Sequence, residues 1–393
     1  MSEGRLRILL HIQDRSAGWA GGLNYLRAVI ELLDCQPEAT RPDILVFNDL
    51  PGSGLQEALN RPAVTCVLGT DGAVLRVREA DMEARLAALE PSQRRRSLAE
   101  QADALYPIVP GDPYPVNPKH WLWVPDFQHR HLPEFFTPDE WAQREARVRE
   151  LLARPCPLIL SSRSALADLK SFFPDHAARP HVWHFRSLAR PQGNDRLREV
   201  RARYGLPDRF LFIPNQFWAH KDHGTAFRAL ARLREQGEVI QLICTGSKED
   251  HRSPDYYDTL FAMVATLGLT GIRHLGSIPH ADVLACLQMA TCVIQPSRFE
   301  GWSTLVEDAL ALGVPLAASQ LPVHVEQMGK DGMFFAPGDA DGLAALLSAR
   351  LPGLPDSTPQ AAVQAAARRY DQVRQAAGAA LLALIGAESG RSG

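Results

Sequence analysis

The sequence has little of what marks several common protein classes. Its six cysteines are scattered over 393 residues without a Cys-x-x-Cys pair, which argues against a zinc ribbon and against a disulfide framework. Hydrophobic residues make up 46% of the chain, yet no window approaches the roughly 18 consecutive apolar residues that span a bilayer. The formal net charge is only −3, so the chain has no basic footprint, and nucleic acid is not an expected partner.

The N-terminus also lacks the features of a secretory signal. Its apolar run, Ile8 to Ile12, is too short for the hydrophobic region of a signal peptide. Several cysteines, such as Cys244, stand inside apolar runs and are expected to be buried thiols in a reducing compartment. We therefore expect a cytoplasmic protein, and peripheral contact with the inner face of a membrane remains open.

Short apolar runs alternate with helical stretches in the second half of the chain. The runs lie at 210–213, 239–244, 272–276, 291–295, 314–318 and 333–336. Between the first two, Phe227, Leu230 and Leu233 recur at near-helical spacing. The first half repeats the pattern more loosely, with runs at 6–12, 43–47, 64–68, 121–124, 158–161 and 181–184, while the proline-rich residues 107–118 are expected to form a loop. Such alternation predicts parallel sheets with helices on both faces.

The expected fold class is α/β, with two Rossmann-like, doubly wound domains facing each other across a cleft. A length of 393 residues suits two domains better than one core. Pro191, Gly193 and Asn194 mark a linker between them. The predicted division is an N-terminal domain over 1–187, a linker over 188–196, a C-terminal domain over 197–360, and an Ala-rich helix with a tail over 361–393.

The strongest functional segment runs from Pro296 to Asp308, where a predicted strand leads into a predicted helix. Gly301 permits close backbone approach, and Ser303 and Thr304 suit a helix N-terminus. The unpaired N–H groups and the positive dipole end of such a helix form an anion site that suits a diphosphate.

Acidic side chains beside this anion site need a separate explanation. Glu300 precedes the helix, and Glu307 and Asp308 lie in its early turns. Carboxylates would repel a phosphate but can accept hydrogen bonds from neutral hydroxyls, such as those of a sugar or a ribose. The alternative is a helix with a capping carboxylate and a solvated acidic face.

In order and spacing, this segment resembles the signature of retaining glycosyltransferases with the GT-B fold, the family 4 type also called glycosyl transferases group 1. In that family a first glutamate contacts the transferred sugar, and a second, after seven intervening residues, contacts the ribose. Glu300 matches the first, and Asp308 stands at the second position, in register with the family's Ala-Leu-Ala. Glu307 is the alternative ribose contact, although it points about 100° away around the helix. The resemblance also implies donor contacts at Gly301, Trp302, Ser303 and Thr304.

A second loop follows the predicted strand 210–213. A lysine at a helix entrance can neutralise the charge that develops on a departing diphosphate. The family carries an Arg and a Lys five positions apart here; Lys221 matches the Lys, but Gln216 stands at the Arg position. Asn215 or Gln216 could donate neutral hydrogen bonds instead, or Arg298 could supply the missing cation.

Four weaker matches complete the site that the resemblance implies. Gly246 lies in a small-residue loop near the nucleotide, and Ile278 lies where the family binds the base. Gly21 and Gly22 resemble the glycine loop that approaches the donor phosphate from the N-terminal domain, and His129 resembles a histidine close to the transferred sugar. Each has an ordinary alternative, an unspecialised turn for the loops and a structural role for the histidine.

Metal ligands are not evident. The thirteen histidines form no His-Glu-x-x-His pattern. The Asp339-Ala340-Asp341 sequence resembles the metal-binding motif of other glycosyltransferases, but it follows Pro337-Gly338, where Asp339 suits a helix N-cap. No metal and no cofactor are expected.

The resemblance implies a function for the whole chain: a retaining, metal-independent hexosyl- or deoxyhexosyltransferase of polysaccharide biosynthesis. Its catalytic residues would be Glu300, Lys221 and His129. The donor would be a UDP-, GDP- or dTDP-sugar bound by the C-terminal domain, and the acceptor a glycan or a lipid-linked molecule bound by the N-terminal one. Two alternatives are an isomerase like the nucleotide-sugar 2-epimerases, which share the architecture, and a non-catalytic nucleotide-sugar binder.

Overall fold

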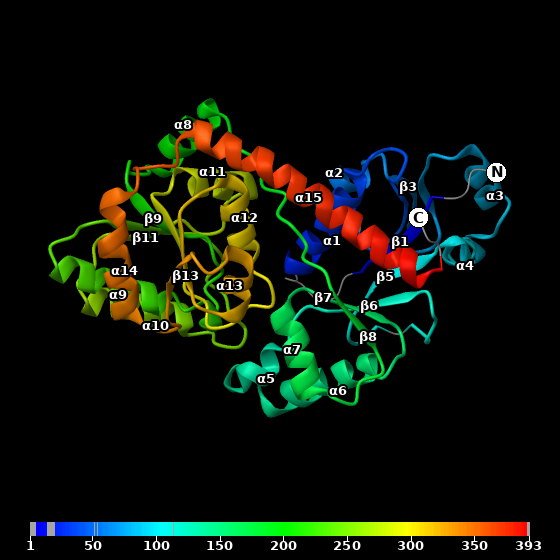
Figure 1. The fold of residues 1–393 in the computed structure, drawn as a ribbon, viewed down its shortest axis with the longest axis horizontal. Coiled ribbons are helices and arrows are strands. Elements are labelled where there is room, and N and C mark those ends of the chain that lie inside the picture. The colour runs from blue at the N-terminus through cyan, green and yellow to red at the C-terminus, as the bar shows by residue number, and fades with distance from the viewer. Residues whose placement is uncertain (1–4, 14–19, 51, 53, 113, 391–393) are drawn as a thin grey trace. The chain divides into compact units, whose positions relative to one another are not determined.

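The computed structural model describes residues 5–13, 20–50, 52, 54–112 and 114–390. The chain forms two compact units (Figure 1). Unit 1 comprises Met1–Asp126, Ala142–Arg186 and Gln372–Gly393, and unit 2 comprises Phe127–Trp141 and Ser187–Asp371. Two segments therefore depart from the predicted division. The short stretch Phe127–Trp141 lies with unit 2, and the end of the last helix lies with unit 1. Residues 391–393 of the predicted tail fall outside the described residues.

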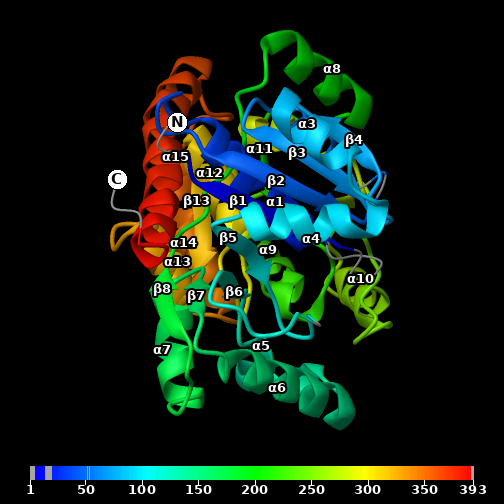
Figure 2. The same ribbon diagram turned by 90° about the vertical axis from the view of Figure 1, so that its right-hand side faces the viewer.

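Unit 1 contains an eight-stranded sheet within its described residues. The strands are β1 (Arg7–Ile12), β2 (Asp43–Asn48), β3 (Val64–Gly69), β4 (Val74–Val77), β5 (Ala104–Ile108), β6 (His120–Val124), β7 (Pro157–Leu160) and β8 (Arg179–Val182). Their order is β4-β3-β2-β1-β5-β6-β7-β8, and neighbouring strands are parallel except β3 and β4. Figure 2 shows β1, β2 and β3 side by side, with α3 next to β4 at the sheet edge. The buried apolar runs of the first half are thus parallel strands, as predicted.

Helices connect these strands. They are α1 (Ala20–Asp34), α2 (Gln56–Leu59), α3 (Ala80–Ala87), α4 (Pro91–Gln101), α5 (Gln128–His131), α6 (Pro138–Leu152) and α7 (Arg163–Phe172), of which α5 and the start of α6 lie in unit 2.

Two strands of unit 1 were not predicted. β4 is a four-residue, half-exposed edge strand, and Arg76 interrupts its short apolar run. β5 begins before the proline-rich stretch that was expected to be a loop, and Pro107 lies inside it. Because proline has no N–H to donate, the pairing of β5 with β6 shifts register between Leu105 and Ile108. Proline within an apolar run therefore concealed a strand that is fully buried.

Unit 2 contains a six-stranded parallel sheet in its described part. The strands are β9 (Phe210–Ile213), β10 (Gln241–Cys244), β11 (Ile272–His274), β12 (Cys292–Gln295), β13 (Leu316–Ser319) and β14 (Met333–Phe335). Their order is β11-β10-β9-β12-β13-β14, and all pairs are parallel. This is the doubly wound order of a Rossmann sheet, and each strand falls on one of the six predicted runs.

The helices of unit 2 alternate with its strands. They are α8 (Asn194–Tyr204), α9 (His223–Glu235), α10 (Tyr256–Thr266), α11 (His280–Met289), α12 (Thr304–Leu312), α13 (Pro322–Met328), α14 (Ala340–Arg350) and α15 (Gln360–Glu388), which ends in unit 1. None of the described helices is both long and apolar enough to cross a membrane.

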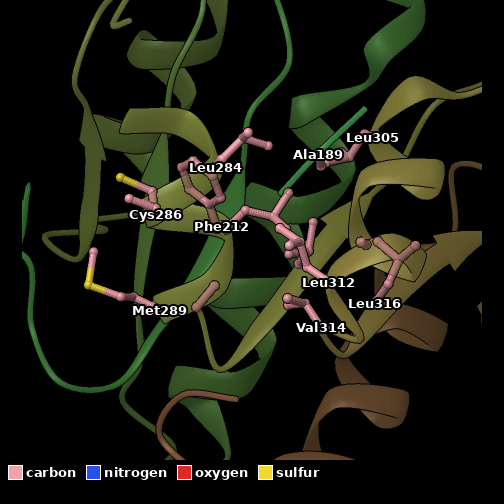
Figure 3. Packing of buried hydrophobic residues seen from close by; sticks show 14 of the residues in the cluster. Ala189, Phe212, Leu284, Cys286, Met289, Leu305, Leu312, Val314 and Leu316 are labelled. Carbon is pink, nitrogen blue, oxygen red and sulfur yellow. The ribbon is translucent and has the colours of Figure 1, made fainter. Parts of the chain in front are cut away.

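Both faces of the unit 2 sheet are buried under helices. Along β9, Phe210 and Phe212 belong to one core cluster, whereas Leu211 and Ile213 belong to another. This alternation follows from the two-residue period of a strand. Figure 3 shows the first cluster, which Leu305 and Leu312 of α12 join. The burial of one face of α12 in this cluster fixes the helix on the sheet.

Two helix ends have the capping residues that the sequence predicts. Gly313 ends α12 in the left-handed conformation, with φ of 65°. Asp339 caps α14, since its carboxylate accepts a hydrogen bond from the Gly342 N–H at 2.8 Å. Asp341 pairs with Arg232 at 2.8 Å. Both carboxylates of the Asp-x-Asp sequence thus have local structural partners, as expected for a capping sequence.

Candidate active site

The candidate site of unit 2 lies where the strand order reverses. β9 and β12 are neighbours in the sheet, but the chain continues from them toward opposite edges. The loops that follow these two strands open next to each other at their carboxyl ends, which is where doubly wound sheets bind ligands. The two loops are joined directly, because the N–H of Arg298 donates to the carbonyl of His220 at 2.8 Å.

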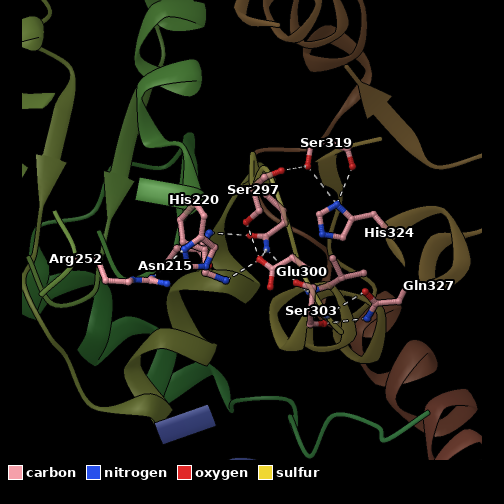
Figure 4. Close-up of polar contacts among 12 residues, drawn as sticks. Asn215, His220, Arg252, Ser297, Glu300, Ser303, Ser319, His324 and Gln327 are labelled. Carbon is pink, nitrogen blue, oxygen red and sulfur yellow. Dashed lines mark hydrogen bonds and ion pairs between the residues drawn. The ribbon is translucent and has the colours of Figure 1, made fainter. Parts of the chain in front are cut away.

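Lys221 and Glu300, predicted from separate motifs, form an ion pair between these loops. Lys221 Nζ lies 2.6 Å from Glu300 Oε1, and the two side chains are only 15% and 10% exposed. The same carboxylate oxygen accepts hydrogen bonds from Ser297 Oγ at 2.7 Å and from Gln295 Nε2 at 2.8 Å (Figure 4). Glu300 is therefore held by neutral donors as well as by the lysine.

Gln295 links both loops to the start of α12. It is fully buried at the end of β12. Its amide oxygen accepts from Asn215 Nδ2 at 2.7 Å, and its Nε2 also donates to Ser303 Oγ at 3.0 Å. Asn215, predicted to contact the donor, thus orients Gln295. The sequence signal for Gln295 is one polar residue that ends an otherwise apolar strand.

Gln216, at the family's arginine position, connects two loops. Its side-chain oxygen accepts a hydrogen bond from the N–H of Ser247, and the Phe217 N–H donates to the Ser247 carbonyl at 2.9 Å. Gly246, next to Ser247, has φ of +127° and packs against the backbone of Asn215. The loop after β10 is thereby pinned to the loop after β9.

We expect the substitution Gly246→Ala to destabilise the protein by about 2–3 kcal/mol. A Cβ at this position would lie 2.4 Å from the Asn215 carbonyl oxygen, in a backbone conformation that L side chains rarely adopt. Gly237→Ala is the matched control, because Gly237 also has positive φ, +86°, but open space around it. Its expected cost is about 1 kcal/mol. Urea unfolding measures both, and equal effects would show that the close approach does not matter.

A strained residue directly follows Lys221. Asp222 has φ of 48°, and among the described residues other than glycine it alone has positive φ. Its carboxylate accepts hydrogen bonds from Thr225 N at 3.3 Å and Thr225 Oγ1 at 2.7 Å, which caps α9. The cap holds the chain in this conformation and so fixes the direction in which Lys221 leaves the backbone.

The histidines that flank this turn are neutral. Burial, with the nearby Lys221 charge as the next cause, lowers the pKa of His220 to about 2 and that of His223 to about 3. His223 stacks on Phe217, with ring centroids 4.1 Å apart. The positive charge at the carboxyl end of β9 therefore comes from lysine and arginine and not from histidine.

The N-terminus of α12 has the features predicted for an anion site. Ser303 is the N-cap, and its Oγ accepts from the Val306 N–H at 3.4 Å. Thr304 is exposed, Gly301 is half-buried and Trp302 is buried. The early backbone N–H groups of this nine-residue helix lie beside the Glu300 loop.

The two candidate ribose contacts face different surroundings. Glu307 is 0% exposed; Gln327 Nε2 donates to its Oε1 at 3.1 Å, and the Tyr370 hydroxyl donates to its Oε2. Asp308 is half-buried, and its Oδ1 accepts from Ser187 Oγ. Burial commits Glu307 to the protein interior, which corrects its assignment as a possible donor contact, whereas the Asp308 carboxylate is half-buried.

The segment Phe127–Trp141 brings the predicted histidine into unit 2. His129 is 0% exposed, its ring lies 5.9 Å from that of Trp141, and its carbonyl accepts from Trp141 Nε1 at 2.7 Å. The neighbouring His131 is exposed, and its ring lies 5.0 Å from Phe299. The histidine nearer the Glu300 loop is thus His131, whereas the side chain of His129 belongs to the interior.

Arg298, expected as a substitute cation, is instead engaged at the surface. Its guanidinium lies 3.2 Å from Glu134 and over the ring of Phe135. A different arginine, Arg252, is largely buried, with Nη2 lying 3.4 Å from His220 Nδ1 and Nη1 donating to Gln128 Oε1 at 3.1 Å. No motif identifies Arg252, because it lies in an irregular loop after β10.

Another buried histidine, His324, supports the Glu300 loop from behind. His324 Nδ1 donates to the Ser319 carbonyl at 2.7 Å, and Ser319 Oγ donates to the Ser297 carbonyl at 2.6 Å (Figure 4). Burial lowers the pKa of His324 and favours its neutral form. It helps to fix the serine that donates to Glu300, and no sequence motif had indicated it.

The remaining predicted residues lie in α1 of unit 1 and in the loop before α11 of unit 2. Gly21 and Gly22 fall in α1, which begins at Ala20 and not after the glycines, so they belong to a first helical turn of unit 1 and not to a loop. The Ile278 side chain is half-buried against the core of unit 2. Across the described part of the chain, no group of three or more His, Cys, Asp or Glu residues is arranged to hold a metal ion.

Comparison with known sequences agrees with the motifs. Residues 196–353 match the family model for glycosyl transferases group 1. The chain is similar to the MMP alpha-(1->4)-mannosyltransferase of Mycolicibacterium hassiacum, with 29% identity over 205 residues that cover 51% of this chain and 46% of that protein. It is similar to the D-inositol 3-phosphate glycosyltransferase of Corynebacterium aurimucosum, with 27% identity over 223 residues, 53% of this chain and 51% of that protein. The chain spans about half the length of these curated relatives.

Comparison with solved structures extends the likeness to the whole chain. A glycosyltransferase from Rickettsia africae superposes with a TM-score of 0.65 at 12% identity, covering 99% of this chain and 100% of that one. The sucrose-phosphate synthase of Thermosynechococcus elongatus gives 0.62 at 16% identity, covering 97% and 98%. Anabaena HepE in complex with UDP-glucose gives 0.62 at 15% identity, covering 96% and 100%. At these identities the likeness concerns the fold, and it confirms the predicted GT-B class with two Rossmann-like domains.

Proposed function

We propose that this chain, which carries a glycosyl transferases group 1 domain over residues 196–353, transfers a sugar from a nucleotide-sugar donor with retention of configuration. The observation that carries the proposal is the Lys221–Glu300 pair beside the N-terminus of α12, at the point where the strand order reverses. The site thus combines a cation, the N-terminus of a helix and a carboxylate at the carboxyl ends of β9 and β12. This combination suits a ligand that has both a diphosphate and free hydroxyls.

Lys221 and Glu300 would exchange partners when the donor binds. A diphosphate at the start of α12 attracts the Lys221 ammonium, which stabilises the charge of the leaving nucleotide. Glu300 keeps Ser297 and Gln295 as donors, and its carboxylate then accepts hydrogen bonds from hydroxyls of the transferred sugar. Because these interactions strengthen as the sugar–phosphate bond breaks, they act on the transition state. We propose that this charge stabilisation requires no metal ion.

Asp308 is the residue we assign to the ribose. Its half-buried carboxylate already accepts a hydrogen bond from the Ser187 hydroxyl, and a ribose hydroxyl would offer the same kind of donor. Gln216 in place of the family's arginine leaves one cation fewer beside the diphosphate. Since its oxygen binds the Ser247 N–H, we assign Gln216 to the architecture of the loop.

The sugar class and acceptor follow the relatives at a coarse level. The similar proteins named above include a mannosyltransferase and an inositol phosphate glycosyltransferase, and a short stretch resembles the O-antigen chain mannosyltransferase B of Escherichia coli, at 31% identity over 74 residues. We propose a hexosyl or deoxyhexosyl donor carried by UDP, GDP or dTDP, and a glycan or lipid-linked acceptor of polysaccharide biosynthesis.

A thermal-shift screen with UDP, GDP and dTDP tests the donor site. One of the three is expected to raise the melting temperature by a few degrees, because a ligand at a hundredfold its Kd stabilises the native state by about 2.7 kcal/mol. No shift with any of them would contradict the proposal. Nucleotide-sugar that turns over without an acceptor would indicate an isomerase, and donor binding without transfer across an acceptor panel would indicate a non-catalytic binder.

A further inference from the structure

A buried hydrogen-bond network runs behind α12 and connects its N-terminus to Asp308. Its members come from four segments of unit 2: Ser187, Ser303, Glu307, Asp308, Gln327 and Tyr370. We call it the α12 network.

The first half of the α12 network holds the helix N-terminus. The Gln327 side chain, on α13, pairs with the backbone of Ser303: its Oε1 accepts from the Ser303 N–H at 3.2 Å, and its Nε2 donates to the Ser303 carbonyl at 2.9 Å (Figure 4). The same Nε2 lies 3.1 Å from Glu307 Oε1. The N-cap residue is therefore tied by its backbone to a side chain that also contacts a buried carboxylate.

The second half of the α12 network reaches Asp308. The Tyr370 hydroxyl, on α15, donates to Glu307 Oε2 and accepts from the Ser187 N–H at 3.2 Å. The Ser187 side chain donates to Asp308 Oδ1 and accepts from the Ala189 N–H at 2.8 Å. The path thus returns to α12 one residue beyond Glu307, on the side that is half-exposed.

The buried members of the α12 network favour one arrangement of its hydrogen bonds. Glu307 is fully buried and Tyr370 is 7% exposed. A buried polar group that loses its partner bears its full desolvation penalty, so the loss of one contact in the network disfavours the arrangement of the others. A displacement of α15 or of the Ser187 segment would therefore alter the placement of α12 through Glu307 and the orientation of the Asp308 side chain through Ser187.

We infer that Glu307 and Tyr370 are positioning residues that set donor affinity by holding the diphosphate end and the ribose end of α12, Ser303 and Asp308, in the orientation that the donor needs. The inference rests on the proposed function, since those two ends are the contacts assigned to the donor. In this inference Glu307 is a buried residue that positions the donor site, while Asp308 contacts the ribose. It also makes the C-terminal helix part of the nucleotide site.

The test compares Tyr370→Phe and Glu307→Gln with a matched control. Tyr204→Phe is suitable, because the Tyr204 hydroxyl also donates to a fully buried carboxylate of unit 2, Asp282, at 2.7 Å, on the α8–α11 contact. We expect Tyr370→Phe and Glu307→Gln each to weaken binding of the stabilising nucleoside diphosphate about three- to tenfold by titration calorimetry. The donor KM should rise by a similar factor, with kcat changed less than about twofold. Tyr204→Phe should bind like the wild type.

The outcomes separate this inference from the proposed function. Wild-type affinity in both network variants would overturn the inference, and so would an equal loss in Tyr204→Phe, because that result reflects general destabilisation. If Tyr370→Phe does not fold, Glu307→Gln alone decides between these outcomes. Failure of the wild type to bind UDP, GDP or dTDP would overturn the proposed function first, and the inference with it.

Discussion

Lys221→Ala is expected to lower the transfer rate at saturating donor by about a hundred- to a thousandfold, or about 2.7–4 kcal/mol of transition-state stabilisation. The Lys221 side chain is only 15% exposed, so in the variant little water can replace the lost ammonium beside the leaving diphosphate. The loss should appear in kcat, because the charge on the leaving group grows as the bond to the sugar breaks. Initial rates of nucleotide release over a range of donor concentrations measure the effect.

Lys248→Ala is the control for Lys221→Ala. Lys248 is exposed in the loop after β10, so its removal changes the net charge of the protein equally but leaves the β9–β12 loops intact. Urea unfolding checks that Lys221→Ala is folded, because its loss leaves Glu300 with neutral partners. A folded Lys221→Ala protein with a rate within threefold of the wild type would refute the role of the lysine.

Glu300→Gln is expected to reduce transfer at least about a hundredfold while nucleotide binding is preserved. A glutamine has the shape of the glutamate but accepts hydrogen bonds from sugar hydroxyls less strongly. In the wild type, the Glu300 carboxylate, 2.6 Å from Lys221 Nζ, competes with the diphosphate for the lysine. The variant lacks this negative charge, so UDP, GDP or dTDP without a sugar should bind it as tightly as the wild type or several-fold more tightly. Calorimetry measures the nucleotide affinity and a transfer assay measures the rate, and the two are expected to change in opposite directions.

Glu249→Gln is the control for Glu300→Gln. Glu249 is exposed, so its substitution should change neither nucleotide affinity nor the transfer rate. Loss of nucleotide binding in Glu300→Gln would indicate that the carboxylate serves the structure of the loop. Retained transfer would remove Glu300 from the mechanism.

The strands of unit 2 are predictable because each is a short apolar run buried on both faces. Phe210 to Ile213 is a simple case, with alternate residues in two different core clusters. β5 was missed because Pro107 interrupts the pattern, although the strand accommodates it with a shift in register. The hydrophobic pattern of the sequence therefore identifies a strand whose hydrogen bonding to its neighbours is regular. It fails for a strand that contains a proline.

The candidate site is predictable by residue type but not by contact. Glu300 and Lys221 stand in recognisable motifs, yet their ion pair depends on how two loops from different strands meet. Glu307 and Asp308 are adjacent in sequence, and only the packing of α13 and α15 against α12 decides which is buried. The same holds for His129, buried beside Trp141, and for Arg252, which belongs to no motif.

The most direct measurement is a crystal structure of the protein with whichever of UDP, GDP or dTDP stabilises it. Our account predicts diphosphate oxygens within about 2.7–3.2 Å of Lys221 Nζ and of N–H groups at the start of α12. It also predicts that the ribose hydroxyls contact Asp308 and that Glu300 is released from the lysine. A nucleotide bound elsewhere, with the Lys221–Glu300 pair unchanged, would contradict it.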